Sequence, residues 1–200
     1  MSVRPDWTAR LAVDLAAARP GLTLCAFCLL PLLLPATAAN WLEYRREAVL
    51  SGEVWRLWSA HLVHYSVAHA VHDGLACLLL ATGLQRAGAG RGMALRLVAI
   101  APILSLLILL SVPEMTNYRG ASGLAMALLA ALNLTLWWIR PGWRPGLLAL
   151  AAVLALKLVA DMQGFTVFPG NLPADIAIAW QVHLAGLVCG WLFWRRAGGG

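Results

Sequence analysis

Long, uninterrupted runs of apolar residues dominate the chain, at about 21–39, 62–84, 93–112, 120–139, 146–160 and 176–194. Short polar pieces, most of them containing Gly or Pro, separate the runs. A run of about 20 apolar residues is long enough to cross the hydrocarbon core of a bilayer as a helix. Within lipid only helices and closed barrels satisfy the backbone polar groups, and these runs are too long for barrel strands. The pattern predicts an all-α membrane protein with about six transmembrane helices.

The composition supports one compact membrane domain. Of the 200 residues, 61% are hydrophobic and only 12% are charged, too few charges for a water-facing surface of ordinary size. The net charge of +6 comes from arginines that stand singly between apolar runs, so we expect no nucleic-acid partner. Each of the four cysteines lies inside an apolar run, where Cys behaves as a small hydrophobe, and we expect neither a disulfide nor a metal from them.

The basic residues predict the orientation. With the N-terminus inside the cell, the inner segments hold ten of the 15 Lys and Arg residues, which favours both termini on the cytoplasmic side of an inner (plasma) membrane. We therefore expect a cytoplasmic segment at 1–20, a membrane domain at 21–195 and a flexible tail at 196–200. Cleavage as a signal peptide after Ala36-Thr37-Ala38 is the alternative for the first run, although a long leader with two aspartates precedes it.

Ionisable groups inside membrane segments are costly and are candidates for function. The second run holds His64, His69 and Asp73, the fourth begins with Ser122, and the sixth holds His183. In the predicted topology these three helices run from outside to inside, and Ser122, His69 and His183 lie at similar depths. A serine hydroxyl becomes a nucleophile when an imidazole takes its proton, so Ser122 and His183 are a candidate nucleophile and base.

Other interpretations of these residues remain open. The sequence Gly120-Ala121-Ser122-Gly123 is also typical of helix packing, and Gly186 with Gly190 forms a GxxxG pattern that favours close contact of the His183 helix with a neighbour. Asp73 is either a protonated donor to an oxyanion or an internal partner for a histidine or an arginine.

The histidines of the second run have a further interpretation. His61, His64, His69 and His72 could bind a metal or haem, but their helical angles are spread over more than one face. A structural or interfacial role for His61 and His64 is the alternative.

These motifs together resemble the rhomboid intramembrane proteases over about residues 40–195. The motifs are Trp55-Arg56, then His64 and His69 five apart, Gly120-Ala121-Ser122-Gly123 and His183-Leu184-Ala185-Gly186. The resemblance implies a six-helix rhomboid-like bundle, a Ser–His dyad without a third carboxylate, no cofactor and no metal. It implies Ser122 as the nucleophile and His183 as the base of a serine endopeptidase.

The resemblance also assigns roles to the remaining candidates. Transition-state stabilisation falls to His69, Asp73 and Gly120, together with the backbone N–H of Ser122. Trp55, Arg56 and His64 take structural or water-leading roles. The expected partners are a transmembrane protein substrate, cleaved near the outer leaflet, and the lipid bilayer.

The short chain and the stretch from Tyr44 through Glu53-Val54-Trp55-Arg56-Leu57 to His64 are most similar to the rhombosortase branch. Rhombosortases are thought to process proteins that carry a C-terminal Gly-Gly, a hydrophobic helix and a basic tail. The chain departs from most rhomboids in having Asp73 in place of Asn, and Met126 where many have a Tyr that stacks on the histidine. The alternatives to a protease are an inactive rhomboid-like protein that binds membrane helices, a metal- or haem-binding protein and a small transporter.

Overall fold

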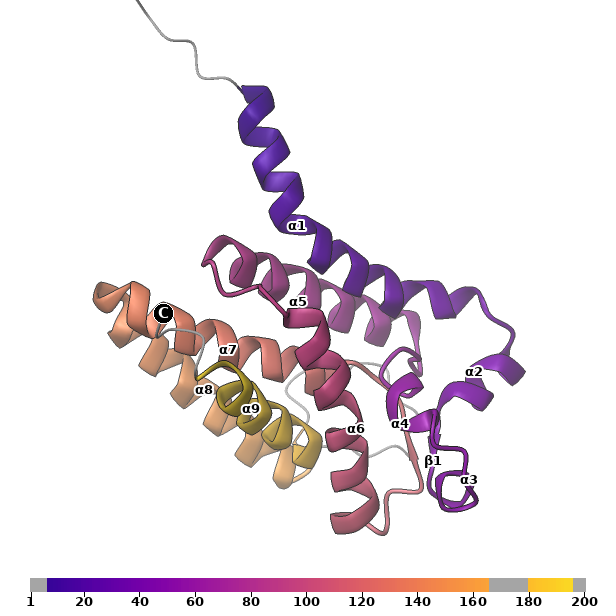
Figure 1. The fold of residues 1–200 in the computed structure, drawn as a ribbon. Coiled ribbons are helices and arrows are strands. Elements are labelled where there is room, and N and C mark those ends of the chain that lie inside the picture. Colours follow the sequence, from indigo (N-terminus) through magenta and orange to yellow (C-terminus); the bar gives the residue numbers. More distant parts are fainter. Residues whose placement is uncertain (1–6, 166–179, 196–200) are drawn as a thin grey trace, which may run out of the picture.

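A computed structural model describes residues 7–165 and 180–195, and these residues form a mostly helical bundle (Figure 1). The long helices are α1 (Trp7–Leu29), α5 (Val67–Arg86), α6 (Met93–Ser111), α7 (Ser122–Ile139), α8 (Arg144–Met162) and α9 (Trp180–Trp194). Short elements complete it: η1 (Leu30–Leu33), α2 (Ala36–Leu42), β1 (Tyr44–Arg45), α3 (Arg46–Leu50), α4 (Arg56–Ser59), β2 (Asn117–Tyr118) and η2 (Pro141–Trp143).

Five segments within the described residues are long and apolar enough to cross a membrane: Leu11–Leu33, Val67–Arg86, Met93–Ser111, Ser122–Ile139 and Pro141–Met162. The chain is therefore a multi-pass membrane protein. The described part of α9 is shorter, with 15 residues, and the predicted start of this helix at 176 lies outside the described residues. The tail predicted at 196–200 lies outside them as well.

The first helix differs from its prediction. It begins by Trp7 and ends at Leu29, whereas the apolar run extends over 21–39. The helix starts well before the apolar run because alanine, leucine and arginine, all good helix formers, make up most of residues 7–19. It ends at Leu29, two residues before Pro31, since a proline disfavours the α conformation at the residue before it. In Figure 1 the first turns of α1 stand clear of the bundle.

The second helix also starts later than predicted. Residues 62–66 form a loop, and α5 begins at Val67 after Ser66, whose side chain accepts a hydrogen bond from the backbone N–H of His69 (3.1 Å). Serine is a preferred N-cap residue because it satisfies a helix N–H in this way. The loop is thus fixed to the start of α5, with His64 in the loop and His69 in the first turn.

Glycines bring α9 against α7 at van der Waals distance. A Cβ at Gly186 would lie 2.1 Å from the carbonyl oxygen of Gly123, and a Cβ at Gly190 would lie 2.1 Å from that of Ala127. Only glycine fits at such positions, as in the small-residue interfaces of membrane helices. The close helix contact predicted from the GxxxG pattern is therefore confirmed, and α7 is its partner.

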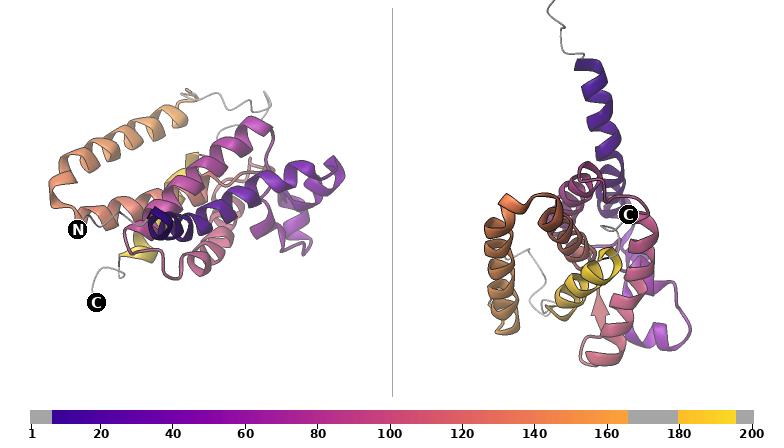
Figure 2. Two further views of the ribbon diagram at one scale, coloured as in Figure 1. Left: turned by 90° about the horizontal axis from the view of Figure 1, so that it is seen from above. Right: turned by 60° about the vertical axis from the view of Figure 1, so that its left-hand side comes forward.

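Helices α5, α7 and α9 run in the same direction, as the predicted topology requires. Near their N-terminal ends, Asp73 of α5 accepts a hydrogen bond from Ala121, just before α7, and His183 of α9 contacts Ser122. At the opposite ends, Trp194 of α9 donates to the carbonyl of Ala89, just after α5. The views in Figure 2 show α8 at the edge of this group, beside α7 and α9.

The segment between α1 and α5 folds over the end of the bundle that holds Ser122. It contains a two-residue antiparallel pairing, Tyr44 with Tyr118 and Arg45 with Asn117, which an all-α prediction does not include. Arg56 is buried at its centre and donates to the Glu53 carboxylate (2.6 Å) and to the carbonyls of Asn40 and Glu43 (2.9 and 2.7 Å). A planar guanidinium with several donors suits this position, because it ties three parts of the segment together at once.

The aromatic residues of this segment remain partly exposed. The Trp55 ring stacks on Trp41 with centroids 4.7 Å apart, and Trp58 donates to the carbonyl of Val98 on α6 (2.9 Å). Half-exposed tryptophans that keep a polar contact are typical of the membrane–water interface. This interfacial segment, residues 30–66, thus packs against α6 while its tryptophans stay partly exposed.

Candidate active site

Ser122 is the first residue of α7, and the chain before it is held from two sides. The backbone N–H of Gly120 donates to the carbonyl of Ala60 (3.0 Å), and that of Ala121 donates to Oδ2 of Asp73 (2.7 Å). The N–H groups of the first turn of a helix have no acceptor within the helix. The backbone N–H of Ser122 therefore has no acceptor within α7, and it lies next to the Ser122 hydroxyl.

Gly120 is required by both its backbone and its surroundings. Its φ of +128° is a conformation that residues with a Cβ rarely adopt. A Cβ at this position would also lie 2.9 Å from Cε1 and Nε2 of His69. The glycine thus allows the chain before Ser122 to lie directly against the imidazole of His69.

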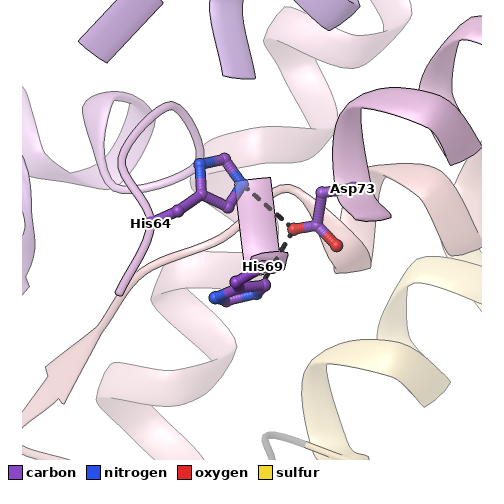
Figure 3. A group of neighbouring side chains, drawn as sticks. All are labelled: His64, His69 and Asp73. Atoms are coloured by element: carbon purple, nitrogen blue, oxygen red, sulfur yellow. Dashed lines mark hydrogen bonds and ion pairs between the residues drawn. The ribbon is translucent and has the colours of Figure 1, made fainter. Parts of the chain in front are cut away.

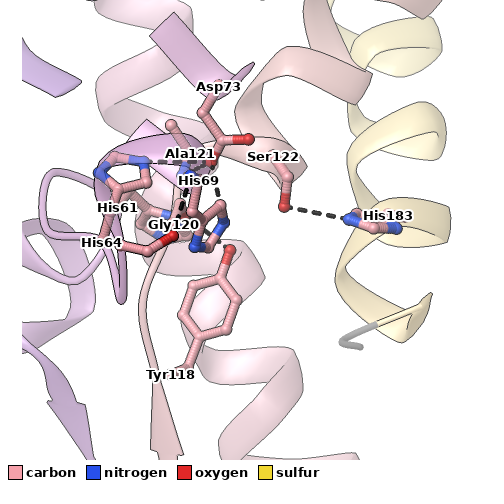
Figure 4. A network of polar contacts seen from close by, with 10 residues as sticks. His61, His64, His69, Asp73, Tyr118, Gly120, Ala121, Ser122 and His183 are labelled. Atoms are coloured by element: carbon pink, nitrogen blue, oxygen red, sulfur yellow. Dashed lines mark hydrogen bonds and ion pairs between the residues drawn. The ribbon is translucent and has the colours of Figure 1, made fainter. Parts of the chain in front are cut away.

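Ser122 and His183 are hydrogen-bonded, with 3.0 Å between Oγ and Nε2 (Figure 4). His183 comes from the second turn of the described part of α9, in a largely buried position. The contact depends on the glycine packing of α9 against α7, since Gly186 lies one turn beyond His183. The meeting of these two side chains, predicted from their depths, is therefore present, and it is the geometry of a hydroxyl and its base.

The other ring nitrogen of His183 faces a residue that the sequence analysis did not select. Nδ1 lies 3.4 Å from Oδ2 of Asp161, which is buried near the end of α8. The same oxygen contacts Nζ of Lys157 at 2.5 Å. A sequence signal did exist, because Lys157 and Asp161 are spaced i and i+4 within an apolar run, but nothing in it indicates which helix they face.

His69 and Asp73 lie on the opposite side of Ser122 from His183, at the start of α5 (Figure 4). The His69 ring is stacked parallel to that of Tyr65, with centroids 6.2 Å apart, and its Nε2 lies 3.5 Å from Oδ2 of Asp73. The structure therefore places an imidazole and a carboxylate together beside Gly120.

Asp73 acts in this arrangement as an acceptor. Its Oδ2 receives the N–H of Ala121 and lies 3.1 Å from Nε2 of His64 (Figure 3). Although burial disfavours a charged imidazole, the hydrogen bond from His64 to Asp73 and the nearby Cys28 thiol raise the pKa of His64 to about 9. Asp73 is thus an internal partner of two histidines, one of the alternatives that the sequence left open.

The histidines do not converge as a group. His61 faces α6 and His72 is exposed, whereas His64, His69 and Asp73 have ligand atoms within 4.8 Å of one another. This spacing fits a metal ion, but hydrogen bonding through Asp73 accounts for it equally well. The absence of a metal stays a prediction.

A second serine–histidine contact lies deeper, where Nε2 of His61 is 3.1 Å from Oγ of Ser105. Both residues are buried, and this pair also fits a Ser–His dyad by distance. Nε2, however, is 2.9 Å from the carbonyl oxygen of Ala101, and the Ser105 hydroxyl donates to the carbonyl of Leu57 (2.9 Å). The shorter of the two carbonyl contacts of His61 therefore places the single proton of a neutral ring on Nε2, which then cannot accept the proton of Ser105.

His61 is further constrained on its other side, where Nδ1 lies 3.3 Å from the carbonyl oxygen of Gly120. Burial lowers the pKa of His61 to about 4, so the ring is neutral at physiological pH. The buried pair thus links α4, α6 and the Ser122 loop. This agrees with the structural alternative for His61, whereas its partner Ser105 gave no sequence signal because it lies in an apolar run.

The comparisons agree with the geometry. The family model described as a Rhomboid domain matches residues 51–196, nearly three-quarters of the chain. A search of curated proteins found no match. The matched region contains both Ser–His contacts, and a serine bonded to an imidazole inside such a domain is the arrangement of a serine-type endopeptidase. The chain therefore belongs to the rhomboid family and is a serine-type endopeptidase of that family.

Proposed function

We propose that the chain cleaves a membrane-anchored protein near the outer leaflet, with Ser122 as the nucleophile and His183 as the general base. The 3.0 Å contact between Ser122 Oγ and His183 Nε2 carries the proposal. Unlike Ser105, Ser122 stands at a helix start, where its backbone N–H has no acceptor within the helix. Within the described residues His183 Nε2 pairs with the Ser122 hydroxyl and not with a carbonyl.

The reaction follows from these positions. Ser122 Oγ attacks the carbonyl carbon of the scissile peptide as its proton passes to His183 Nε2. His183 then protonates the leaving amine, and the C–N bond breaks to give an acyl-enzyme. Water attacks the ester as His183 takes its proton, and His183 returns that proton to Ser122 Oγ as the C–O bond breaks and the acid product leaves.

The developing oxyanion needs donors on the other side of Ser122. The backbone N–H of Ser122 and the ring of His69 are the proposed donors, with Gly120 giving the carbonyl oxygen room to approach. Because Asp73 Oδ2 already accepts the Ala121 N–H, we propose that Asp73 orients His69 and the Ser122 loop. Replacing Asp73 would then lower activity through the misplacement of His69 and the Ser122 loop.

The residues of the interfacial segment support the site from outside. Arg56 holds the segment together, Trp55 stacks at its surface, and His64 binds the far side of Asp73. We propose that all three are structural, with the polar side chains near the site leading water towards Ser122.

The test uses Ser122→Ala, His183→Ala and the matched control Ser105→Ala with a tagged membrane substrate. Cleavage should be lost in the first two variants and kept in the control. A fluorophosphonate probe should label the wild type and Ser105→Ala, and labelling should vanish in His183→Ala. Cleavage by Ser122→Ala would remove the proposal, and loss confined to Ser105→Ala would move the dyad to His61.

The substrate class is proposed from sequence similarity to the rhombosortase branch. The stretch from Tyr44 to His64 supports it, and it implies substrates with a C-terminal Gly-Gly, a hydrophobic helix and a basic tail. A reporter with this tail should be cleaved, and replacement of Gly-Gly by Val-Val should prevent cleavage. Equal cleavage of both reporters would contradict the branch assignment and leave the dyad untouched.

The location is likewise a proposal. The excess of arginines on one side supports an inner (plasma) membrane with both termini in the cytoplasm. Alkaline phosphatase fused to the C-terminus should then be inactive. An active fusion would reverse the orientation and place the site at the inner leaflet.

A further inference from the structure

Helix α8 is exposed or partly exposed along its length, and two of its residues are buried. Leu147 near its start and Asp161 near its end are buried, and the Asp161 side chain is 1% exposed. A carboxylate is among the most costly groups to bury next to lipid. The one buried acid of this helix is also the one that faces His183.

The two nitrogens of His183 therefore face two different groups. Nε2 contacts the Ser122 hydroxyl at 3.0 Å, and Nδ1 lies 3.4 Å from Asp161 Oδ2. The imidazole lies between a hydroxyl and a carboxylate from separate helices, α7 and α8, and its buried Nδ1 is near the carboxylate without a formed hydrogen bond. This is the order of contacts in a Ser–His–Asp triad.

We propose that Asp161 is a positioning residue that completes a triad with Ser122 and His183. The inference rests on the proposed function and goes beyond the two-residue dyad that the family resemblance implies. Asp161 would also orient His183 in this chain, where Met126 stands in place of a tyrosine that stacks on the histidine. Met126 lies on the face of α7 that packs against Gly186, one turn beyond His183 on α9.

The carboxylate would act in two steps of the reaction. Before attack it accepts the Nδ1–H of His183, which leaves Nε2 unprotonated and able to take the Ser122 proton. After attack it stabilises the imidazolium that forms. Asp161 itself keeps its charge throughout, and the proton moves only between Ser122, His183 and the leaving amine.

Lys157 is part of the same arrangement. Its Nζ contacts the oxygen that faces His183, so the lysine compensates the carboxylate where lipid offers no solvation. A rival explanation follows from this contact: Asp161 is buried only to pair with Lys157, one turn away on the same helix. The two explanations differ in what each residue does to the chemical step.

The experiment compares Asp161→Asn with Gly146→Ala, a control on the same helix, in full-length protein reconstituted in vesicles, using the tagged substrate and the fluorophosphonate probe. The triad predicts that Asp161→Asn lowers kcat at least about tenfold with KM changed less than about twofold, and slows Ser122 labelling to match. Gly146→Ala, whose added Cβ meets no atom within 4 Å, should cleave at the wild-type rate. A kcat for Asp161→Asn within threefold of wild type, which the pairing with Lys157 alone predicts, or equal losses in the two variants, would overturn the triad.

A second measurement needs no variant of Asp161. In ¹⁵N-histidine-labelled Ser122→Ala protein, the His183 ring should carry its proton on Nδ1, with the signal assigned by its absence in Ser122→Ala/His183→Ala. A ring protonated on Nε2 would overturn the proposal even if Asp161→Asn does not fold. Cleavage by Ser122→Ala would instead remove the proposed function, so the two failures are distinct.

Discussion

Replacing Gly186 by alanine should move the catalytic base away from the nucleophile. The added Cβ would lie 2.1 Å from the Gly123 carbonyl oxygen, whereas real Cβ contacts essentially never fall below 3.0 Å. The helix α9 must therefore shift by about 0.9 Å or more. His183 lies one turn away, and a rigid shift directly away from α7 would lengthen the 3.0 Å contact with Ser122 to about 3.9 Å.

The expected cost is large for activity and moderate for stability. A contact of this length is no longer a hydrogen bond, and a misplacement near 1 Å costs on the order of 10²-fold in rate. Overpacking costs about 1–3 kcal/mol, offset by up to about 1 kcal/mol because alanine is the better helix former. The net loss should lower Tm by about 2–8 °C.

The assay pairs cleavage rate with thermal unfolding of the purified protein in detergent. Gly146→Ala is the matched control, since Gly146 lies in α8 and its Cβ would meet no atom within 4 Å. That variant should unfold no lower than wild type and cleave at the wild-type rate. If Gly186→Ala also kept the wild-type Tm and rate, the close approach of α7 and α9 would be refuted, and with it the reason that Ser122 and His183 meet.

Three further predictions test the surroundings of the site. Arg56→Lys should lower stability by about 1–3 kcal/mol in thermal unfolding, because an ammonium cannot keep all three contacts of the buried guanidinium, whereas exposed Arg45→Lys should change little. Gly120→Ala should reduce cleavage more than Gly88→Ala, because both glycines have positive φ but only the first touches the site. For His64, whose pKa of about 9 exceeds the ordinary value near 6.5, stability should be complete below about pH 6.5 and fall as pH rises towards 9. His64→Gln should flatten that pH profile of Tm, and an unchanged profile would contradict the assignment.

Helix positions were predictable where the apolar run and the helix coincide. The runs at 93–112 and 120–139 match α6 and α7 closely, because their polar flanks are also their helix ends. The prediction failed for α1, because the apolar run at 21–39 overlaps only the end of this helix and continues through η1 into α2. It also failed at 62–66, where Ser66 was an available N-cap signal within a run that looked continuous.

The candidate site, like the helices, could be predicted from the sequence only in part. Ser122, His183, His69 and Asp73 could be selected because each is polar within an apolar run and the topology fixes their depth. The partner of each side chain could not be selected, since it depends on how each helix is rotated about its axis. Asp161 is the clearest case, because sequence places it near an outer helix end but only packing turns it towards His183.

The buried charges around Ser122 come in pairs, each made of one carboxylate and one basic side chain. Two buried carboxylates flank the serine and its base, Asp73 on α5 and Asp161 on α8, and each has a basic partner at hydrogen-bond distance. His64 with its raised pKa and Lys157 thus neutralise charges that lipid would not solvate. Because each carboxylate is compensated locally, each lies beside an imidazole, His69 or His183, without adding net charge near Ser122. Rigid, prepaired dipoles of this kind stabilise a transition state with little reorganisation, so the two pairs should matter more for kcat than for substrate affinity.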